Sequence, residues 1–410
     1  MKLGAFIYDN KNLLSSVIIL DQMKKTRYFS FIFIMIFFLC SVLITPLAQA
    51  VENPLSTPNN KIGVHILFTT ELEAAAKLVN GNGGDYGYVT IAIQSGDKDI
   101  EKWQTFLNRS RELHIIPIIR LATEGNPFNT KVWRTPTDYD IIDFANFLNS
   151  LNWPYKNRYI IVYNEVNRGD EWGGGLNPRE YAELLSYTVT VFKSKSSDFF
   201  IIPAGLDNAA PNQSTLYMNQ YNYMREMNAA VPGIFNQVDG LSSHSYPNPG
   251  FSQPPTANST MGINSFQYEQ ALIKSFGSKD LPVFITETGW STEVIPDAKA
   301  AQYYNTALSG TWSDKSIVAL TPFLLQGSGG PFQKFSLLGA EGGTSKQYEA
   351  IKNYSKIKGK PTQTKSVLAA TSTYDISTKP LKDFSEQEIE TSQIAPSDEI
   401  KGAFKWLLKI

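Results

Sequence analysis

The feature that most constrains this chain is a regular alternation of short apolar segments with longer amphipathic ones across residues 61–358. The apolar segments are almost uninterrupted, as strands of a parallel sheet buried on both faces must be. The segments between them carry helical periodicity. Eight strand–helix units in about 300 residues predict an α/β fold of the (β/α)8 barrel type, and a doubly wound open sheet is the alternative. The expected strands are 61–66, 86–93, 115–120, 159–163, 199–202, 238–244, 281–286 and 318–325.

The first fifty residues carry the pattern of an export signal. A basic segment at 23–27 precedes an apolar run at 28–43, and Ala48 and Ala50 form a small-x-small cleavage site. We therefore expect a secreted protein cleaved after Ala50, with residues 1–22 lying upstream of the true start. An uncleaved signal anchor is the alternative, because the apolar run approaches the length of a membrane span.

Composition divides the rest of the chain. We expect a linker at 51–60, the barrel at 61–358 and a polar linker or tail at 359–410, where Ser, Thr, Asp, Glu and Lys replace most large apolar residues. Such a composition is typical of disordered segments. The N-terminal run and this tail are the two segments through which the chain would associate with a membrane or cell surface.

Charge and cysteine content exclude several functions. The formal net charge is −1 and the barrel segment has no basic block, so we exclude nucleic acid as a partner. The single cysteine, Cys40, lies in the export signal, which leaves the exported chain no disulfide and no thiolate metal site. The three histidines are widely separated, and neither a His-Glu-x-x-His nor a Gly-x-Ser-x-Gly pattern occurs. We expect neither a metal nor a cofactor.

Polar residues follow three of the expected strands. Asn164 and Glu165 end the fourth strand, His244 and Tyr246 the sixth, and Glu287 the seventh. In a barrel of this type, functional side chains gather where the strands end. Cleavage of a glycosidic bond requires two carboxyl groups, one to protonate the leaving oxygen and one that is ionised. Glu165 and Glu287 are the candidates for this pair.

This arrangement resembles clan A of the glycoside hydrolases, the 4/7 superfamily of retaining (β/α)8 enzymes that includes cellulases, mannanases and xylosidases. The resemblance extends over the whole predicted barrel. It implies that Glu165 is the acid/base and Glu287 the nucleophile. It also implies that Asn164 hydrogen-bonds the sugar 2-hydroxyl, that Tyr246 donates to the nucleophile, and that His244 binds or orients the sugar.

The aromatic platform of the clan has no direct counterpart here. Many clan members carry a tryptophan at the end of strand eight, where this chain has Phe323 and, three residues on, Gln326. Either residue would take its place, or Trp290 after strand seven would supply the platform instead.

Several further residues are candidates for substrate contact. Arg120 would match the arginine near the nucleophile, although it ends the expected third strand and the clan's arginine lies on the second. Trp172 and Trp133 either line subsites or pack beneath loops. His65, inside the first strand, is a scaffold histidine or faces the barrel mouth. Glu171 is expected to be a solvated loop charge, with sugar contact as the alternative.

The sequence thus predicts a retaining glycoside hydrolase that acts by double displacement on carbohydrate, with bonds of the β type. Two alternatives share most of these features. A non-catalytic carbohydrate-binding barrel would keep the aromatic residues, and a transglycosidase would keep the same residues but disfavour water as the acceptor.

Overall fold

The computed structural model describes residues 51–126, 129–327, 332–339 and 342–365, and the fold is given for these. The predicted export signal and most of the predicted tail lie outside them, and the predicted domain boundaries stay predictions. Among the described helices, none has the length and apolar character needed to cross a bilayer.

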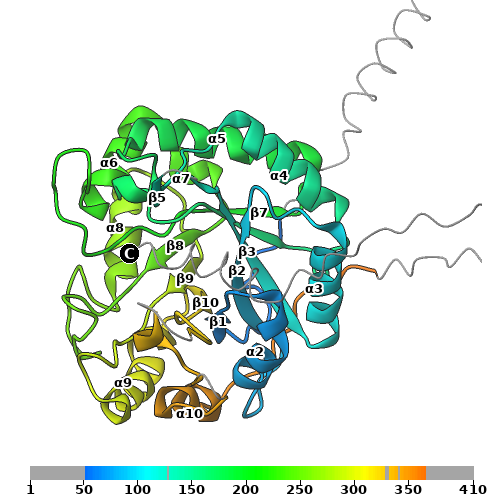
Figure 1. Ribbon diagram of the computed structural model, residues 1–410, viewed down its shortest axis with the longest axis vertical. Coiled ribbons are helices and arrows are strands. Elements are labelled where there is room, and N and C mark those ends of the chain that lie inside the picture. The colour runs from blue at the N-terminus through cyan, green and yellow to red at the C-terminus, as the bar shows by residue number, and fades with distance from the viewer. Residues whose placement is uncertain (1–50, 127–128, 328–331, 340–341, 366–410) are drawn as a thin grey trace, which may run out of the picture. The chain divides into compact units, whose positions relative to one another are not determined.

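Eight parallel strands form a closed barrel, which confirms the predicted fold and excludes the open sheet (Figure 1). One sheet has the order β1-β2-β3-β6-β7 and the other the order β10-β9-β8. Two isolated parallel bridges, Ile62 with Leu320 and Asp207 with His244, join the sheets at both seams. The strands are β1 (Gly63–His65), β2 (Gly87–Gln94), β3 (Ile115–Ala122), β6 (Arg158–Val162), β7 (Phe199–Pro203), β8 (Leu241–His244), β9 (Val283–Glu287) and β10 (Ile317–Leu320).

Helices surround the barrel, one or two after each strand (Figure 1). Local sequence sets where they begin: Thr137 and Asp140 form a capping box at the start of α4, and Asn177 caps α5 with Pro178 as its first residue. A small hairpin, β4 (Gly125–Asn126) and β5 (Asn129–Trp133), is inserted between β3 and α4. The helices are α2 (Leu72–Val79), α3 (Ile100–Glu112), α4 (Asp138–Ser150), α5 (Pro178–Lys195), α6 (Gln220–Ala230), α7 (Ile234–Gln237), α8 (Ser265–Ser275), α9 (Asp297–Ser309) and α10 (Lys346–Asn353), with short 3₁₀ turns η1 (Thr69–Glu71), η2 (Gly169–Glu171), η3 (Thr311–Ser313) and η4 (Gln333–Phe335).

The strands bury both of their faces, which explains their continuous apolar sequence. On β3, Ile115 and Ile119 pack in the layer between strands and helices, whereas Ile116 and Ile118 pack with residues inside the barrel. Successive side chains of a strand point to opposite faces, so the next inward position after Ile118 is Arg120. The alternation of inward and outward side chains along β3 therefore places the buried Arg120 at the barrel mouth.

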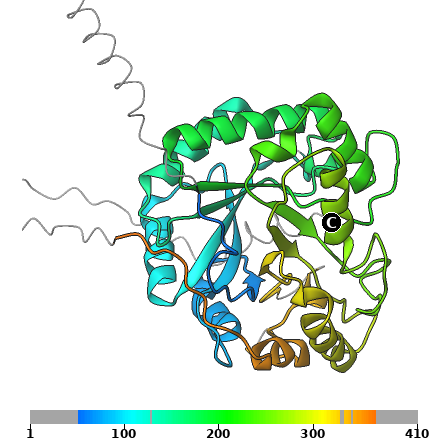
Figure 2. The ribbon, with the colours of Figure 1, turned by 180° about the vertical axis from the view of Figure 1, so that it is seen from behind.

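The two ends of the described chain lie at the opposite end of the barrel, where the strands begin. Val51 and Leu55, in the segment predicted as a linker, pack against the interior cluster there. The peptide N–H of Lys156 donates to the carbonyl of Thr362, and Arg111 at the end of α3 donates to Thr364. Figure 2 shows these last described residues, in orange, running from α10 back toward α3.

Candidate active site

A pocket of about 200 Å³ opens at the barrel mouth, among the loops that follow the strands. Its polar side holds the two candidate carboxyl groups, and its other side is largely aromatic. Residues from seven of the eight strand ends take part, which agrees with the general rule that such barrels build their sites at this end.

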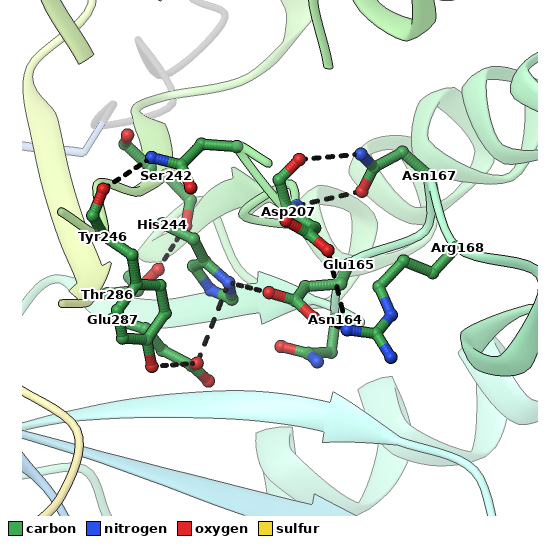
Figure 3. A network of polar contacts seen from close by, with 12 residues as sticks. Asn164, Glu165, Asn167, Arg168, Asp207, Ser242, His244, Tyr246, Thr286 and Glu287 are labelled. Carbon is green, nitrogen blue, oxygen red and sulfur yellow. Dashed lines mark hydrogen bonds and ion pairs between the residues drawn. The ribbon is translucent and has the colours of Figure 1, made fainter. Parts of the chain in front are cut away.

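Glu165 and Glu287 face each other across this pocket (Figure 3). One oxygen of each, together with a ring nitrogen of His244, lies in a group whose members are all within 4.8 Å of one another. Carboxyl groups about 5–5.5 Å apart are typical of retaining glycosidases, whereas inverting enzymes separate them by about 6.5–9.5 Å. The spacing is therefore nearer that of retaining enzymes, in which one carboxylate attacks the sugar directly.

His244 lies between the two glutamates. Its Nδ1 is 3.0 Å from Oε1 of Glu165 and 3.8 Å from Oε2 of Glu287, and the side chain is buried. Burial alone would lower the pKa of this imidazole, but the neighbouring charges of Glu287 and Glu165 outweigh it and raise the pKa above its ordinary value. The two carboxylates thus favour the protonated, positively charged form of the ring.

Glu287 is surrounded by donors. Arg120 donates from a terminal guanidinium nitrogen to Oε1 at 2.5 Å, and the Tyr246 hydroxyl donates to Oε2 at 3.0 Å. Burial would raise the pKa of this carboxyl, but the charges of His244 and Arg120 outweigh burial and hold the pKa well below its usual range. Glu287 is therefore ionised at neutral pH, as an attacking carboxylate must be.

Arg120 also connects the two halves of the site. The guanidinium that contacts Glu287 donates to Oδ1 of Asn164 at 2.7 Å. Because the amide oxygen is occupied, the amide nitrogen of Asn164 is the part left to meet a ligand in the pocket. The strand count from sequence is correct, and Arg120 reaches Glu287 from the third strand.

The backbone after β6 turns sharply to present Glu165. Tyr163 and Glu165 have φ values of 69° and 33°, a region that side-chain-bearing residues rarely occupy and that is enriched at functional sites. The peptide N–H of Glu165 donates to the carbonyl of Gly205 at 3.0 Å, which ties the turn to the end of β7.

Arg168 and Asp207 lie beside Glu165 (Figure 3). Arg168 lies 3.4 Å from Oε2 of Glu165 and also pairs with Asp170 at 2.8 Å and Asp207 at 3.6 Å. Burial, followed by the charge of Glu165, raises the pKa of Asp207 to about 6. The same two causes raise the pKa of Glu171 to about 8. Glu171 is half-buried and lines the pocket, which favours contact with a ligand over a fully solvated loop charge.

Phenylalanine rings form the opposite wall. Of the two residues predicted to replace the clan's tryptophan, Phe323 lines the pocket and Gln326 is not among the lining residues. The rings of Phe323 and Phe332 have centroids 5.1 Å apart, and Phe251 and Phe335 are 5.0 Å apart in edge-to-face contact. The wall therefore offers apolar surface on which a sugar ring can pack.

Two predicted contacts are not brought to the pocket. Trp290 is completely buried between Tyr304 and Trp312, and its indole N–H donates to the carbonyl of Gln253 at 2.8 Å. Trp172 is 1% exposed and its indole donates to Glu180 at 2.9 Å. Both rings are buried and each indole N–H already has an acceptor in the chain, so they support the loops and do not face a ligand.

Other lining residues were not predicted as contacts. Asp207 follows the fifth strand, a position that the strand-end rule could have indicated. Arg168 and Lys334 also line the pocket, as do Phe251, Phe332 and Phe335. Their loops are brought together by the barrel, and no local sequence pattern marks them. Trp133, for which the sequence allowed either a subsite or a position beneath a loop, also lines the pocket.

Glu165, His244 and Glu287 lie close enough together to be considered as ligands of one metal ion. The charge around them argues against it. Arg120 contacts Glu287 at 2.5 Å, Arg168 flanks Glu165, and His244 has a raised pKa. A cation would have to replace these positive groups, so the cluster fits a pair of carboxyl groups tuned by neighbouring cations better than a metal centre.

Sequence comparison gives no relatives: no model of a known protein family and no curated protein matches the chain. Comparison of the fold finds glycoside hydrolases. A family 39 glycoside hydrolase from the gut symbiont Bacteroides cellulosilyticus WH2 matches with a TM-score of 0.52 and 16% identity over 74% of this chain and 64% of that one, so the chain spans less than two thirds of its length. A family 39 enzyme from Xanthomonas axonopodis pv. citri gives a TM-score of 0.53, 15% identity and coverages of 76% and 71%.

A family 39 β-xylosidase from Caulobacter crescentus gives a TM-score of 0.51 and 15% identity, with coverages of 74% and 72%. These neighbours are clan A (β/α)8 barrels, so the predicted resemblance to that clan is confirmed for the fold. At such identities the likeness establishes the barrel, and activity has to be argued from the site itself.

Proposed function

We propose that this protein is a retaining glycoside hydrolase that cleaves β-linked sugars. The observation that carries the proposal is the facing pair Glu165 and Glu287, with oxygens within 4.8 Å and with different surroundings. Cations and a tyrosine hydroxyl surround Glu287 and favour its ionised form. Glu165 lies on the other side of the pair, at the turn after β6, where it can deliver a proton.

In the first step, a carboxylate oxygen of Glu287 attacks the anomeric carbon while Glu165 gives its proton to the glycosidic oxygen. The carbon–oxygen bond to the leaving group breaks, and a glycosyl ester on Glu287 forms. Tyr246 and Arg120 hold the attacking carboxylate in place. The amide nitrogen of Asn164 is positioned to donate to the sugar 2-hydroxyl, a contact that strengthens in the transition state.

In the second step, the now ionised Glu165 removes a proton from water. The resulting hydroxide attacks the anomeric carbon, and the ester bond to Glu287 breaks to restore the carboxylate. Two displacements at the same carbon retain its configuration. His244, which contacts Glu165 and lies near Glu287, supports this alternation because its positive charge can balance whichever carboxylate is ionised.

The test is hydrolysis of a panel of aryl β-glycosides and soluble β-glucans, mannans and xylans, with the anomeric product followed by NMR. We expect a product of retained configuration, and we expect Glu165→Gln and Glu287→Gln to lower kcat by a factor of about 10⁴ or more on substrates with poor leaving groups. Azide should rescue Glu165→Ala as the β-glycosyl azide and Glu287→Ala as the α-glycosyl azide, which separates the two roles.

Other outcomes would point elsewhere. If the parent protein binds a glycan but turns over none, and both glutamine variants bind it equally well, the barrel is a carbohydrate-binding protein. If products grow longer when acceptor sugars are added, the protein is a transglycosidase. Export remains part of the proposal, and the mature N-terminus of secreted protein, read by mass spectrometry, tests cleavage after Ala50.

A further inference from the structure

His65 is a buried residue of the pocket that the proposed mechanism does not use. It is the last residue of β1, its exposed fraction is 0%, and it lines the same pocket as the two glutamates. Neither Nδ1 nor Nε2 has a hydrogen-bond partner among the described residues. Buried polar groups are almost always paired, and an unpaired one is costly. An imidazole left in this state points to a partner that a ligand supplies.

The surrounding chain holds the His65 ring in a fixed place. Its backbone N–H donates to the carbonyl of Pro322 at 3.0 Å, and its carbonyl accepts from the N–H of Leu325 at 2.9 Å. The ring packs against Phe323 with centroids 5.1 Å apart. The ring is also fully enclosed, so the imidazole has little room to turn toward another partner.

The charges that face the ring keep it neutral. Arg120 on β3, His244 on β8 and Glu287 on β9 are its charged neighbours. Burial is the largest cause and the charge of Arg120 the next, and together they lower the pKa of His65 to about 3. A neutral imidazole offers one N–H donor and one bare acceptor nitrogen. A sugar hydroxyl can accept the first or donate to the second, whereas a charged imidazole could only donate.

We infer that His65 is a specificity-determining residue that hydrogen-bonds one hydroxyl group of the sugar held over Glu287. The inference rests on the proposed function. It follows from the position of the ring at the pocket wall beside Phe323, with both nitrogens unpaired. A sugar that lacks this hydroxyl, or carries it in the other configuration, leaves the buried imidazole without a partner and is discriminated against.

The experiment combines enzyme variants with deoxy substrates. On the aryl β-glycoside that the parent hydrolyses best, and on its monodeoxy analogues, kcat/KM is measured for the parent, His65→Phe and His65→Gln. Phenylalanine keeps the ring volume and removes both nitrogens, while glutamine keeps one donor and one acceptor. His114→Gln, a change in a histidine at the start of the barrel strands that pairs with Asp85, is the matched control.

We expect His65→Phe to lower kcat/KM on the full sugar by about 10- to 100-fold, the effect of one hydrogen bond and its unpaired partner. On one particular deoxy analogue the same variant should lose less than about threefold, and His65→Gln should recover part of the discrimination. A loss equal on all analogues in both variants would overturn the inference. Thermal unfolding confirms that each variant is folded, and if His65→Phe is not, the His65→Gln series alone decides.

Failure of the inference about His65 can be told apart from failure of the proposed function. If the parent hydrolyses no glycoside, the glycosidase assignment fails. If the parent is active and the His65 variants show the same substrate preference as the parent, the assignment stands and the role of His65 is refuted.

Discussion

The imidazole of His244 lies directly against the backbone of Gly205. A Cβ built at position 205 would come within 2.5 Å of Nε2 of the ring and would overlap its Cδ2. The carbonyl of the same glycine accepts the peptide N–H of Glu165. A residue without a side chain, just after β7, therefore fixes both the histidine and the turn that carries one of the two carboxyl groups.

Gly205→Ala should reduce activity while the barrel remains folded. The added methyl group must displace the His244 ring, which contacts Glu165 and lies near Glu287, and a misplacement of about 1 Å can cost a factor of about 10² in rate. We expect kcat/KM to fall about 100-fold, measured on a soluble substrate of the parent. Gly343→Ala is the control, because a Cβ there meets nothing within 4 Å. Equal activity of the two variants would show that the position of His244 is unimportant.

Arg120→Met should shift the pH dependence of catalysis. Arg120 is one of the groups that hold the pKa of Glu287 low, so its removal lets that pKa rise. Glu287 must be ionised to attack, and it would become protonated at a higher pH than in the parent. The acidic limb of the kcat/KM profile should therefore move to higher pH, and the loss of activity should be greater at pH 5 than at pH 7.

Arg120→Lys serves as the comparison for this prediction. Lysine keeps the positive charge near Glu287 but cannot bridge Glu287 and Asn164 through one planar group. We expect the acidic limb to stay near its parental position while kcat/KM falls by about 10-fold, the scale of a charge-assisted hydrogen bond. An acidic limb that moves equally in both variants would mean that hydrogen-bond geometry, and not charge, sets the pKa of Glu287.

Trp290→Phe should affect stability and leave kinetics alone. The indole is buried among Tyr304 and Trp312 and donates to a backbone carbonyl, so the smaller ring leaves a cavity and an unpaired acceptor. We expect the free energy of unfolding to fall by about 2 kcal/mol, measured by urea unfolding. Both kcat and KM should stay within about twofold of the parent values. A raised KM at unchanged stability would instead indicate that Trp290 contacts the substrate.

Phe323→Ala should weaken substrate binding. Its ring lines the pocket and packs with Phe332 and Phe335, so its removal takes away apolar surface on which a sugar ring can pack. We expect KM to rise by about 3- to 10-fold with a smaller change in kcat. Phe323→Trp, which keeps an aromatic ring of larger area at this position, should bind substrate at least as well as the parent. If alanine leaves KM unchanged, the aromatic wall plays no part in binding.

Sequence patterns predicted the barrel because its strands bury both faces and so must be apolar along their whole length. The same patterns predicted that Glu165 and Glu287 would meet, since parallel strands end at one edge. They failed for Trp290 and Trp172, because a tryptophan after a strand can face a ligand or fill space beneath a loop with equal chemical ease. Only the packing of other elements, here α9 and α5, decides between these positions.

The long loops were the other part that sequence could not place. Phe251 lies in the loop after β8, and Phe332 and Phe335 lie in the loop after β10, yet they pack near one another. No local sequence pattern predicts this contact, because it depends on how two distant loops fold over the barrel mouth. The raised pKa of Glu171 has the same origin, because burial under folded loops is invisible in a sequence that looks hydrophilic.

Both ends of the described chain meet at the floor of the barrel, on the side away from the pocket. A tether at either end would therefore attach the protein at the end of the barrel where the strands begin, and would leave the pocket at the other end exposed. Immobilisation on a resin, or fusion to a second module at residue 51 or 365, should leave access to the pocket intact. Attachment through the loop that carries Phe251 would instead close the entrance.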